Sequence, residues 1–466
     1  MAFSANFQRF LLSRGEKAGD LNPRSRLLRL LILCLLLLFQ SHQAFGYSVL
    51  THEAIIDAEW EDHIKPLFVA RFPRATAQQL HEAQAYAYGG SVIQDMGYYP
   101  FGSRFFSHLT HYVRSGYFVQ ALFNESRDIN DYAFALGALS HYVADIEGHS
   151  IAVNRSVGLL YPALHKKYGD SVTWEESPWE HSLTEFGFDT LEVVAHHVAP
   201  EGYHQWIGFK VARPLLQRAF KKTYGLNLSD QILSVRIALF SYRELASSAI
   251  PEMAEVTWAL RRKQLEELAS NFQHRQLYHL SRKSYRGWQS KYAKPGVGDE
   301  MEAFLFRIIP KVGPFNVIQF HSPTLETEKL FADSLRATVQ RYELELRQIE
   351  SGKLDPPDMD LDTGSPTRPG EYRYCDRTYA QLLRKLESKR FMGVDAALRS
   401  NLLEFYKHAG DNAVSKNRRQ WRRVLRTIEE LKSASAPPSS SPANSTVQDP
   451  SAAVFVLHRN LLRSCP

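Results

Sequence analysis

Apolar residues recur at spacings of three and four over long stretches of this chain. Clear examples are residues 133–153, 229–250, 324–351 and 414–433, each of which keeps its apolar residues on one side of a helix. The sequence contains no sustained alternation of apolar and polar residues of the kind that indicates strands. The pattern therefore predicts an all-α protein.

The helical pattern divides into two regions and a tail. We place a first domain over residues 47–200 and a further helical region, with no role inferred, over 201–432. A loop rich in Pro, Asp and Gly interrupts the second region at 352–371. Residues 433–466 are rich in Ser, Pro and Ala and have little to bury, which predicts a disordered low-complexity tail.

Three aspartates in the 352–371 loop have the spacing that opens a calcium-binding loop: Asp358, Asp360 and Asp362. The sixth position of that pattern is Thr363 instead of Gly, and the twelfth is Pro369 instead of Glu. Those two positions supply the sharp turn and the bidentate ligand of a calcium loop, so the sequence argues against calcium here.

Residues 1–46 have the pattern of a signal peptide. A basic region precedes an apolar core of ten residues, 30–39, and the small residues Ala44 and Gly46 suit cleavage before Tyr47. The apolar core is shorter than the roughly twenty residues of a membrane-spanning helix. We therefore expect an exported protein, secreted or periplasmic, after this segment is removed.

Cleavage would also remove most of the excess positive charge. The whole chain has a formal net charge of +6, and residues 1–46 contain six Lys or Arg against two Asp or Glu, which leaves +2. So small a charge does not support a general attraction to polyanions, and no stable nucleic-acid partner is expected. The basic run at 416–426 is interpreted as the solvated face of a helix.

Histidines and carboxylates cluster in the first domain at helical spacing. His141, Asp145 and His149 follow one another at intervals of four, as do His181 and Glu185, so each set lies along one side of a helix. Apolar residues surround the first set, so its carboxylate needs a charged or hydrogen-bonded partner. Zinc accepts imidazole and carboxylate ligands, and the first domain has no cysteine that would indicate a thiolate site. The spacing predicts a metal site that faces the core.

Other candidates lie near the mature start and in the run SHLTHY. Thr51 can cap a helix that begins near His52. If cleavage exposes Tyr47, its amine and carbonyl oxygen are five residues from His52, close enough for all three donors to chelate one ion. His108 and His111 lie three residues apart in SHLTHY.

The order of these motifs resembles the zinc-dependent phospholipase C/D superfamily over about residues 47–192. The motifs are THEAI near the mature start, an aspartate in GGSVIQDMGYYP, then FFSHLTHY, ALGALSHYVADIEGHS and HSLTEFGFD. The likeness is greatest to the amino-terminal domain of glycosylphosphatidylinositol-specific phospholipase D. That domain similarly has three residues between the aspartate of its HxxxD motif and the next histidine, the gap between Asp145 and His149 here. Tyr47 replaces a tryptophan common in the family, but the implied ligands there are backbone atoms.

The resemblance implies an all-α, multi-helix phospholipase C-like catalytic domain that holds three zinc ions. Asp145 would bridge two of the metals, Asp95 or Asp145 would orient the attacking water or accept its proton, and His111 is the alternative to His108. The implied metal ligands form three sets: Tyr47 with His52; Asp95, His108 and His141; and His149, His181 and Glu185.

The resemblance also implies a zinc-dependent phosphodiester hydrolase that acts on phospholipid head groups, and a peripheral contact with the membrane is compatible with such a substrate. Glu185 favours phospholipids, because the related zinc nucleases typically end this motif in HxxxD. A zinc-dependent nuclease or nucleotidase on the same metal cluster stays open. So does a metal-stabilised binding protein without catalysis, because residues 201–432 lie outside the resemblance.

Overall fold

The computed structural model describes residues 49–194, 204, 207–250, 253, 254, 257, 320–407, 409 and 418–434. The predicted signal peptide, Tyr47, the expected boundary near residue 200 and the tail beyond residue 434 lie outside these ranges. No helix within them is long and apolar enough to span a membrane.

The described part of the chain is helical, which confirms the all-α prediction. Its only strands are β1 (Met359–Asp360) and β2 (Ser365–Pro366), which pair antiparallel within the 352–371 loop. The helices before residue 200 are α3 (Val49–Glu59), η1 (Trp60–Ile64), α4 (Lys65–Arg71), α5 (Ala77–Ser91), η2 (Ile93–Tyr98), α6 (Arg104–Tyr112), α7 (Ser115–Asn124), α8 (Ile129–Glu147), η3 (Gly148–Val153), α9 (Asn154–Leu160), α10 (Pro162–Tyr168) and α11 (Pro178–Val194). The later helices are α13 (Arg213–Tyr224), η4 (Leu228–Asp230), α14 (Val235–Glu244), η5 (Leu245–Ala249), α18 (Leu325–Glu350), α19 (Arg373–Ser388), α20 (Ala396–Lys407) and α21 (Arg418–Ser433).

Local side chains define where several helices begin. The Asp128 carboxylate accepts hydrogen bonds from the backbone N–H groups of Asn130 and Asp131 at the start of α8. Thr76 and Gln79 form a capping box at the start of α5. Such caps satisfy backbone donors that have no partner inside the helix.

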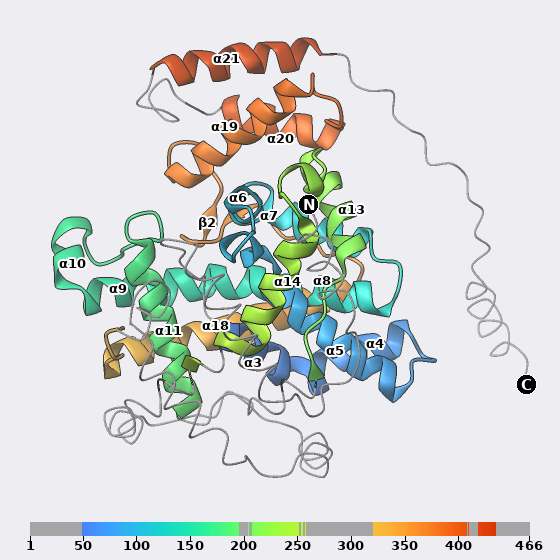
Figure 1. The fold of residues 1–466 in the computed structure, drawn as a ribbon, viewed down its shortest axis with the longest axis vertical. Helices are drawn as coiled ribbons and strands as arrows, with labels where there is room; N and C mark the ends of the chain where they lie inside the picture. The colour runs from blue at the N-terminus through green and yellow to red at the C-terminus, as the bar shows by residue number, and fades with distance from the viewer. Residues whose placement is uncertain are drawn as a thin grey trace, which may run out of the picture.

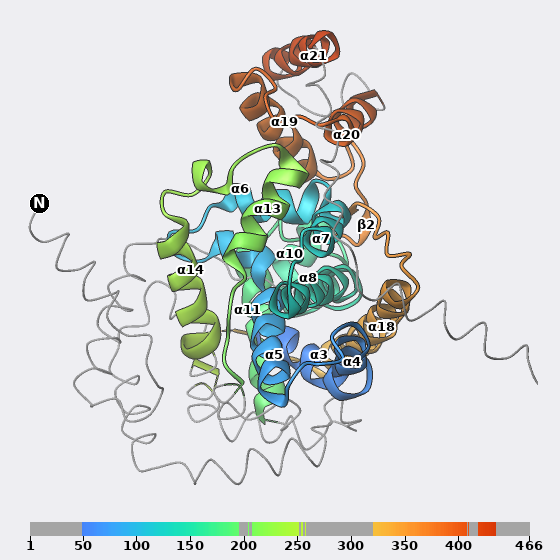
Figure 2. The same ribbon diagram turned by 90° about the vertical axis from the view of Figure 1, so that its right-hand side faces the viewer.

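Helix α8 runs through the middle of the molecule and packs against α5, α7 and α18 (Figures 1 and 2). Two glycines let α5 and α8 touch backbone to backbone. A Cβ atom on Gly137 would lie 2.0 Å from the carbonyl oxygen of Ala87, and one on Gly90 would lie 2.1 Å from that of Phe134. This close crossing brings the end of α5 against the face of α8 that carries His141.

The later helices share their core with the earlier ones. One cluster of buried apolar side chains extends from Val49 to Leu431, and the rings of Phe106 and Phe220 stack across it at 5.7 Å. Helix α18 lies along α8 and η3, whereas α19, α20 and α21 gather at the top of Figure 1. The chain between α18 and α19, including β1, passes over α6 and α7, which places it next to the site described below.

Candidate metal centre

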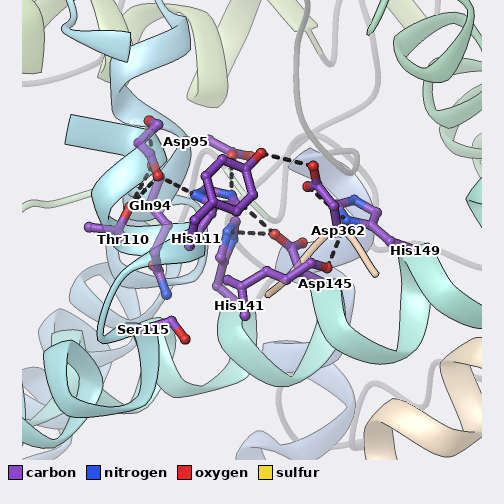
Figure 3. Close-up of polar contacts among 12 residues, drawn as sticks. Gln94, Asp95, Thr110, His111, Ser115, His141, Asp145, His149 and Asp362 are labelled. Atoms are coloured by element: carbon purple, nitrogen blue, oxygen red, sulfur yellow. Dashed lines mark hydrogen bonds and ion pairs between the residues drawn. The ribbon is translucent and has the colours of Figure 1, made fainter. Parts of the chain in front are cut away.

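Buried histidines and carboxylates from several helices converge around Asp145 of α8 (Figure 3). The Oδ2 atom of Asp145 lies 3.1 Å from Nε2 of His141 and 3.3 Å from Nε2 of His111, and its Oδ1 atom lies 3.5 Å from Nε2 of His52. His111 Nε2 is also 3.2 Å from Oδ1 of Asp95. One carboxylate therefore stands among three imidazoles, with a second carboxylate beside them.

A second set of side chains lies at the end of α8. The π-helix η3 continues α8 and carries His149, whose Nε2 atom lies 3.4 Å from Oε1 of Glu185. His181, one turn before Glu185 on α11, has its Nδ1 atom 3.0 Å from the same oxygen. π-helical turns are rare and often lie at functional sites.

These side chains form three groups, and within each the possible ligand atoms all lie within 4.8 Å of one another. The groups are His52, His141 and Asp145; Asp95, His111 and His141; and His149, His181 and Glu185.

Three histidines of the cluster share one hydrogen-bonding arrangement. Nδ1 of His111 lies 2.7 Å from the carbonyl oxygen of Ser107, and Nδ1 of His141 lies 2.9 Å from that of Ser91. Nδ1 of His149 lies 3.1 Å from the carbonyl oxygen of Leu361, in the 352–371 loop. A carbonyl oxygen only accepts, so each Nδ1 carries the proton. Each Nε2 is then left to face the carboxylates, as in metal-ligating histidines.

The charges of the cluster depend on one another. Burial alone would lower the pKa of His111, but hydrogen bonds to Asp145 and Asp95 outweigh it and raise that pKa well above its usual value. Burial likewise opposes ionisation of Asp145, but the neighbouring His141 and His149 bring its pKa well below the usual range. In the metal-free protein, imidazoles thus supply the positive charge that the buried carboxylate requires.

The chemistry of these side chains fits zinc. Several ligand atoms are buried without a well-aligned hydrogen bond inside the described ranges, and apart from Glu185 Oε2 they have only the ion-pair contacts given above: Asp95 Oδ1, Asp145 Oδ1, His181 Nδ1 and both carboxylate oxygens of Glu185. Burying a polar atom without a good hydrogen bond costs about 1–3 kcal/mol, which a bound cation would offset. Burial and the nearby His141 lower the pKa of His52, which favours the neutral imidazole that a metal needs. Imidazole and carboxylate ligands without a thiolate are those of catalytic zinc sites.

The structure distinguishes the two histidines of SHLTHY, which the sequence left open as alternatives. His111, and not His108, stands with Asp95 and His141. His108 points instead toward aromatic side chains, with its ring 5.0 Å from that of Tyr374 and 5.6 Å from that of Tyr112. Burial lowers the pKa of His108 to about 4. His108 belongs to none of the ligand groups in the described chain.

The prediction that Thr51 caps a helix beginning near His52 was wrong. Helix α3 already includes Val49, and Thr51 lies inside it. The Thr51 hydroxyl donates to Asp189 of α11 instead of capping its own helix. Tyr47, the remaining proposed ligand, lies outside the described residues.

Sequence reasoning missed the loop at 352–371 as part of this site. Asp362 lies beside His149 (Figure 3), with its Oδ1 atom 3.7 Å from Nδ1 of that histidine. The hydroxyl of Tyr112 donates to Oδ2 of Asp362 at 2.8 Å. The loop carries three closely spaced aspartates, but no spacing in the sequence connects them to residues more than two hundred positions earlier.

An all-α fold in which buried imidazoles and carboxylates converge, with no thiolate among them, defines the class of a candidate zinc hydrolase. Residues 51–230 match the family model described as zinc-dependent phospholipase C. The match covers every cluster residue in the three ligand groups and supports the superfamily resemblance and a hydrolase acting on phospholipids. No curated protein and no solved structure matches the chain. The closer likeness to glycosylphosphatidylinositol-specific phospholipase D is therefore not supported.

Proposed function

We propose that this protein is an exported zinc-dependent phosphodiesterase that hydrolyses phospholipid head groups. The observation that carries the proposal is the convergence of three ligand groups around Asp145 inside the region that matches zinc-dependent phospholipase C. A phosphodiester is anionic, so attack on it requires positive charge near its oxygens.

The three ligand groups would hold the zinc ions. When bound, zinc neutralises phosphate oxygens and lowers the pKa of water toward about 7. Asp145 lies between two of the groups through its contacts with His52, His111 and His141. Asp95 offers the buried Oδ1 atom as an acceptor for the proton of the attacking water or as the group that orients that water.

We further propose that the protein holds three zinc ions and that the amino end of the mature chain, at Tyr47, is a ligand of the third. The proposed additional ligands beside His52 are the amine and carbonyl oxygen of Tyr47. The free amine would exist only after removal of residues 1–46. The composition of this third site therefore depends on cleavage before Tyr47, which would accompany export.

The test uses the processed protein with zinc restored. Vesicles of phosphatidylcholine, vesicles of phosphatidylinositol and single-stranded DNA are compared as substrates, and the products are identified by mass spectrometry. Release of phosphocholine indicates cleavage of the phospholipase C type, and release of choline indicates the D type. Hydrolysis of DNA alone would favour the nuclease, and zinc binding without turnover of any phosphodiester would favour the binding protein.

A matched pair of variants ties the activity to the cluster. His181→Ala removes a buried histidine whose Nδ1 faces Glu185, and we expect it to abolish phospholipid hydrolysis. His165→Ala removes a histidine that is 52% exposed and contacts Asp170, and it should leave the activity within about twofold. Full activity and full zinc content in His181→Ala would overturn the proposal.

A further inference from the structure

We propose that Leu361 and Asp362, which lie outside the matched family region, position the two histidines of the His149, His181 and Glu185 group. This inference rests on the proposed function of that group as a zinc site. It gives the helical region after residue 230 a role, because the loop between α18 and α19 would complete the metal centre from behind its ligands.

The first connection runs through the backbone of Leu361. Its carbonyl oxygen lies 3.1 Å from Nδ1 of His149 and accepts the proton of that nitrogen. The opposite nitrogen, Nε2, is then the one that would bind a metal, and it lies 3.4 Å from Oε1 of Glu185. The loop thus sets the tautomer of His149 that can bind a metal on the side of Glu185.

The second connection runs through Asn154 of α9. The Nδ2 atom of Asn154 donates to the carbonyl oxygen of Asp362 at 2.7 Å, which orients its amide. The Oδ1 atom of the same amide lies 2.9 Å from Nε2 of His181 and accepts its proton. Nδ1 of His181 is left to bind a metal together with Glu185, whose Oε1 atom lies 3.0 Å away. Two adjacent carbonyl groups of one loop therefore stand behind both histidines.

Buried contacts hold this part of the loop in place. The hydroxyls of Tyr112 and Tyr372 both donate to Oδ2 of Asp362, whose side chain is almost fully buried. The backbone N–H of Leu361 donates to the carbonyl oxygen of His111 at 3.2 Å. The Asp362 side chain is therefore the anchor that keeps both carbonyl groups aimed at the site.

The magnitude of the effect follows from the behaviour of outer-shell partners of metal ligands. Losing such a partner typically lowers metal affinity by about 10–100-fold, because the ligand loses its preferred tautomer and orientation. A loop that only filled space would not change the metal's coordination. Zinc affinity and the spectrum of a substituted metal therefore distinguish positioning from packing.

The experiment compares Asp362→Asn with Asp358→Asn in the full processed chain. Asp358 belongs to the same loop, but its carboxylate accepts from the backbone N–H of Tyr117 and from Asn401, not from groups that face the metal site. Zinc affinity is measured by chelator competition, and the d–d absorption of the Co²⁺-substituted proteins reports the coordination geometry. Thermal unfolding of the metal-free proteins measures the cost to the fold.

We expect Asp362→Asn to bind zinc about 10–100-fold more weakly and to show an altered Co²⁺ spectrum, with Asp358→Asn close to wild type. Tyr112→Phe removes one donor to Asp362 and should shift affinity in the same direction, so it provides the test if Asp362→Asn does not fold. Equal zinc affinity and equal spectra in all the variants would overturn the inference. A wild-type protein that binds no zinc would instead overturn the proposed function.

Discussion

The Nε2 atom of His111 lies 3.2 Å from the Oδ1 atom of Asp95, and both side chains are almost fully buried. His108, three residues earlier on α6, packs on aromatic rings instead. Loss of an outer-shell partner of a metal ligand lowers metal affinity by roughly 10–100-fold. We expect His111→Ala, which removes a ligand itself, to weaken zinc binding by more than this. The zinc affinity of His108→Ala should stay within a few-fold of wild type. Chelator competition on both proteins measures this, and a larger loss in His108→Ala would reverse the assignment.

The start of α3 is held by Asp189 of α11. Its carboxylate accepts from the backbone N–H groups of Leu50 at 3.0 Å and Thr51 at 3.1 Å, and from the Thr51 hydroxyl at 2.7 Å. Because α3 carries His52, these bonds place that histidine beside Asp145.

Asp189→Ala would leave buried backbone donors without partners, and we expect it to lower the free energy of unfolding by about 1–3 kcal/mol. Thr51→Val removes only the hydroxyl bond and is the matched control, with a smaller expected cost. Urea denaturation of both variants compares them. If Asp189→Ala proves no less stable than Thr51→Val, the backbone bonds do not secure the helix.

The crossing of α5 and α8 depends on Gly137. An added Cβ would collide with the Ala87 carbonyl, so Gly137→Ala must push the two helices apart. We expect a loss of about 1–3 kcal/mol in stability and weaker zinc binding, because the Ser91 carbonyl that holds Nδ1 of His141 moves with α5.

Ser140→Ala is the control on the same helix. The hydroxyl of Ser140 is buried and makes no hydrogen bond inside the described ranges, so its removal should be nearly neutral. Denaturation and zinc titration of both variants separate the two effects. Normal zinc affinity in a destabilised Gly137→Ala would show that the helix crossing does not position His141.

The raised pKa of Glu59, at the end of α3, leads us to expect that the stability of the fold depends on pH. Burial raises the pKa of Glu59 to about 7 from its ordinary 4.5; His63 opposes the shift, whereas Glu343 and Asp62 add to it. Because the folded pKa exceeds the unfolded value, the protonated carboxyl favours the folded state below about pH 4.5. This contribution is lost as the pH rises through about 7 and amounts to at most about 3 kcal/mol.

Glu59→Gln keeps a neutral side chain at every pH. We therefore expect the variant to be more stable than wild type at pH 8, with a smaller difference at pH 5. Unfolding free energies at the two pH values, measured in chelator, check this. The same difference at both values would mean that Glu59 does not titrate near 7.

Local spacing was enough to predict the helices and the pairs within them. Residues four apart are neighbours on any α-helix, and the structure accordingly places His141 3.1 Å from Asp145 and His181 3.0 Å from Glu185. The all-α fold followed in the same way from apolar residues at spacings of three and four. These predictions needed no knowledge of how the helices pack.

The sequence by itself thus determined the helical class and the candidate pairs inside α8 and α11. Only the tertiary structure decided that His111 faces Asp95, because the rotation of α6 against η2 selects between two histidines on one helix. It also brought Asp362 to His149, across more than two hundred residues. The physical reason is that periodicity within a helix depends on one turn of backbone, whereas contacts between elements depend on the packing of the whole core.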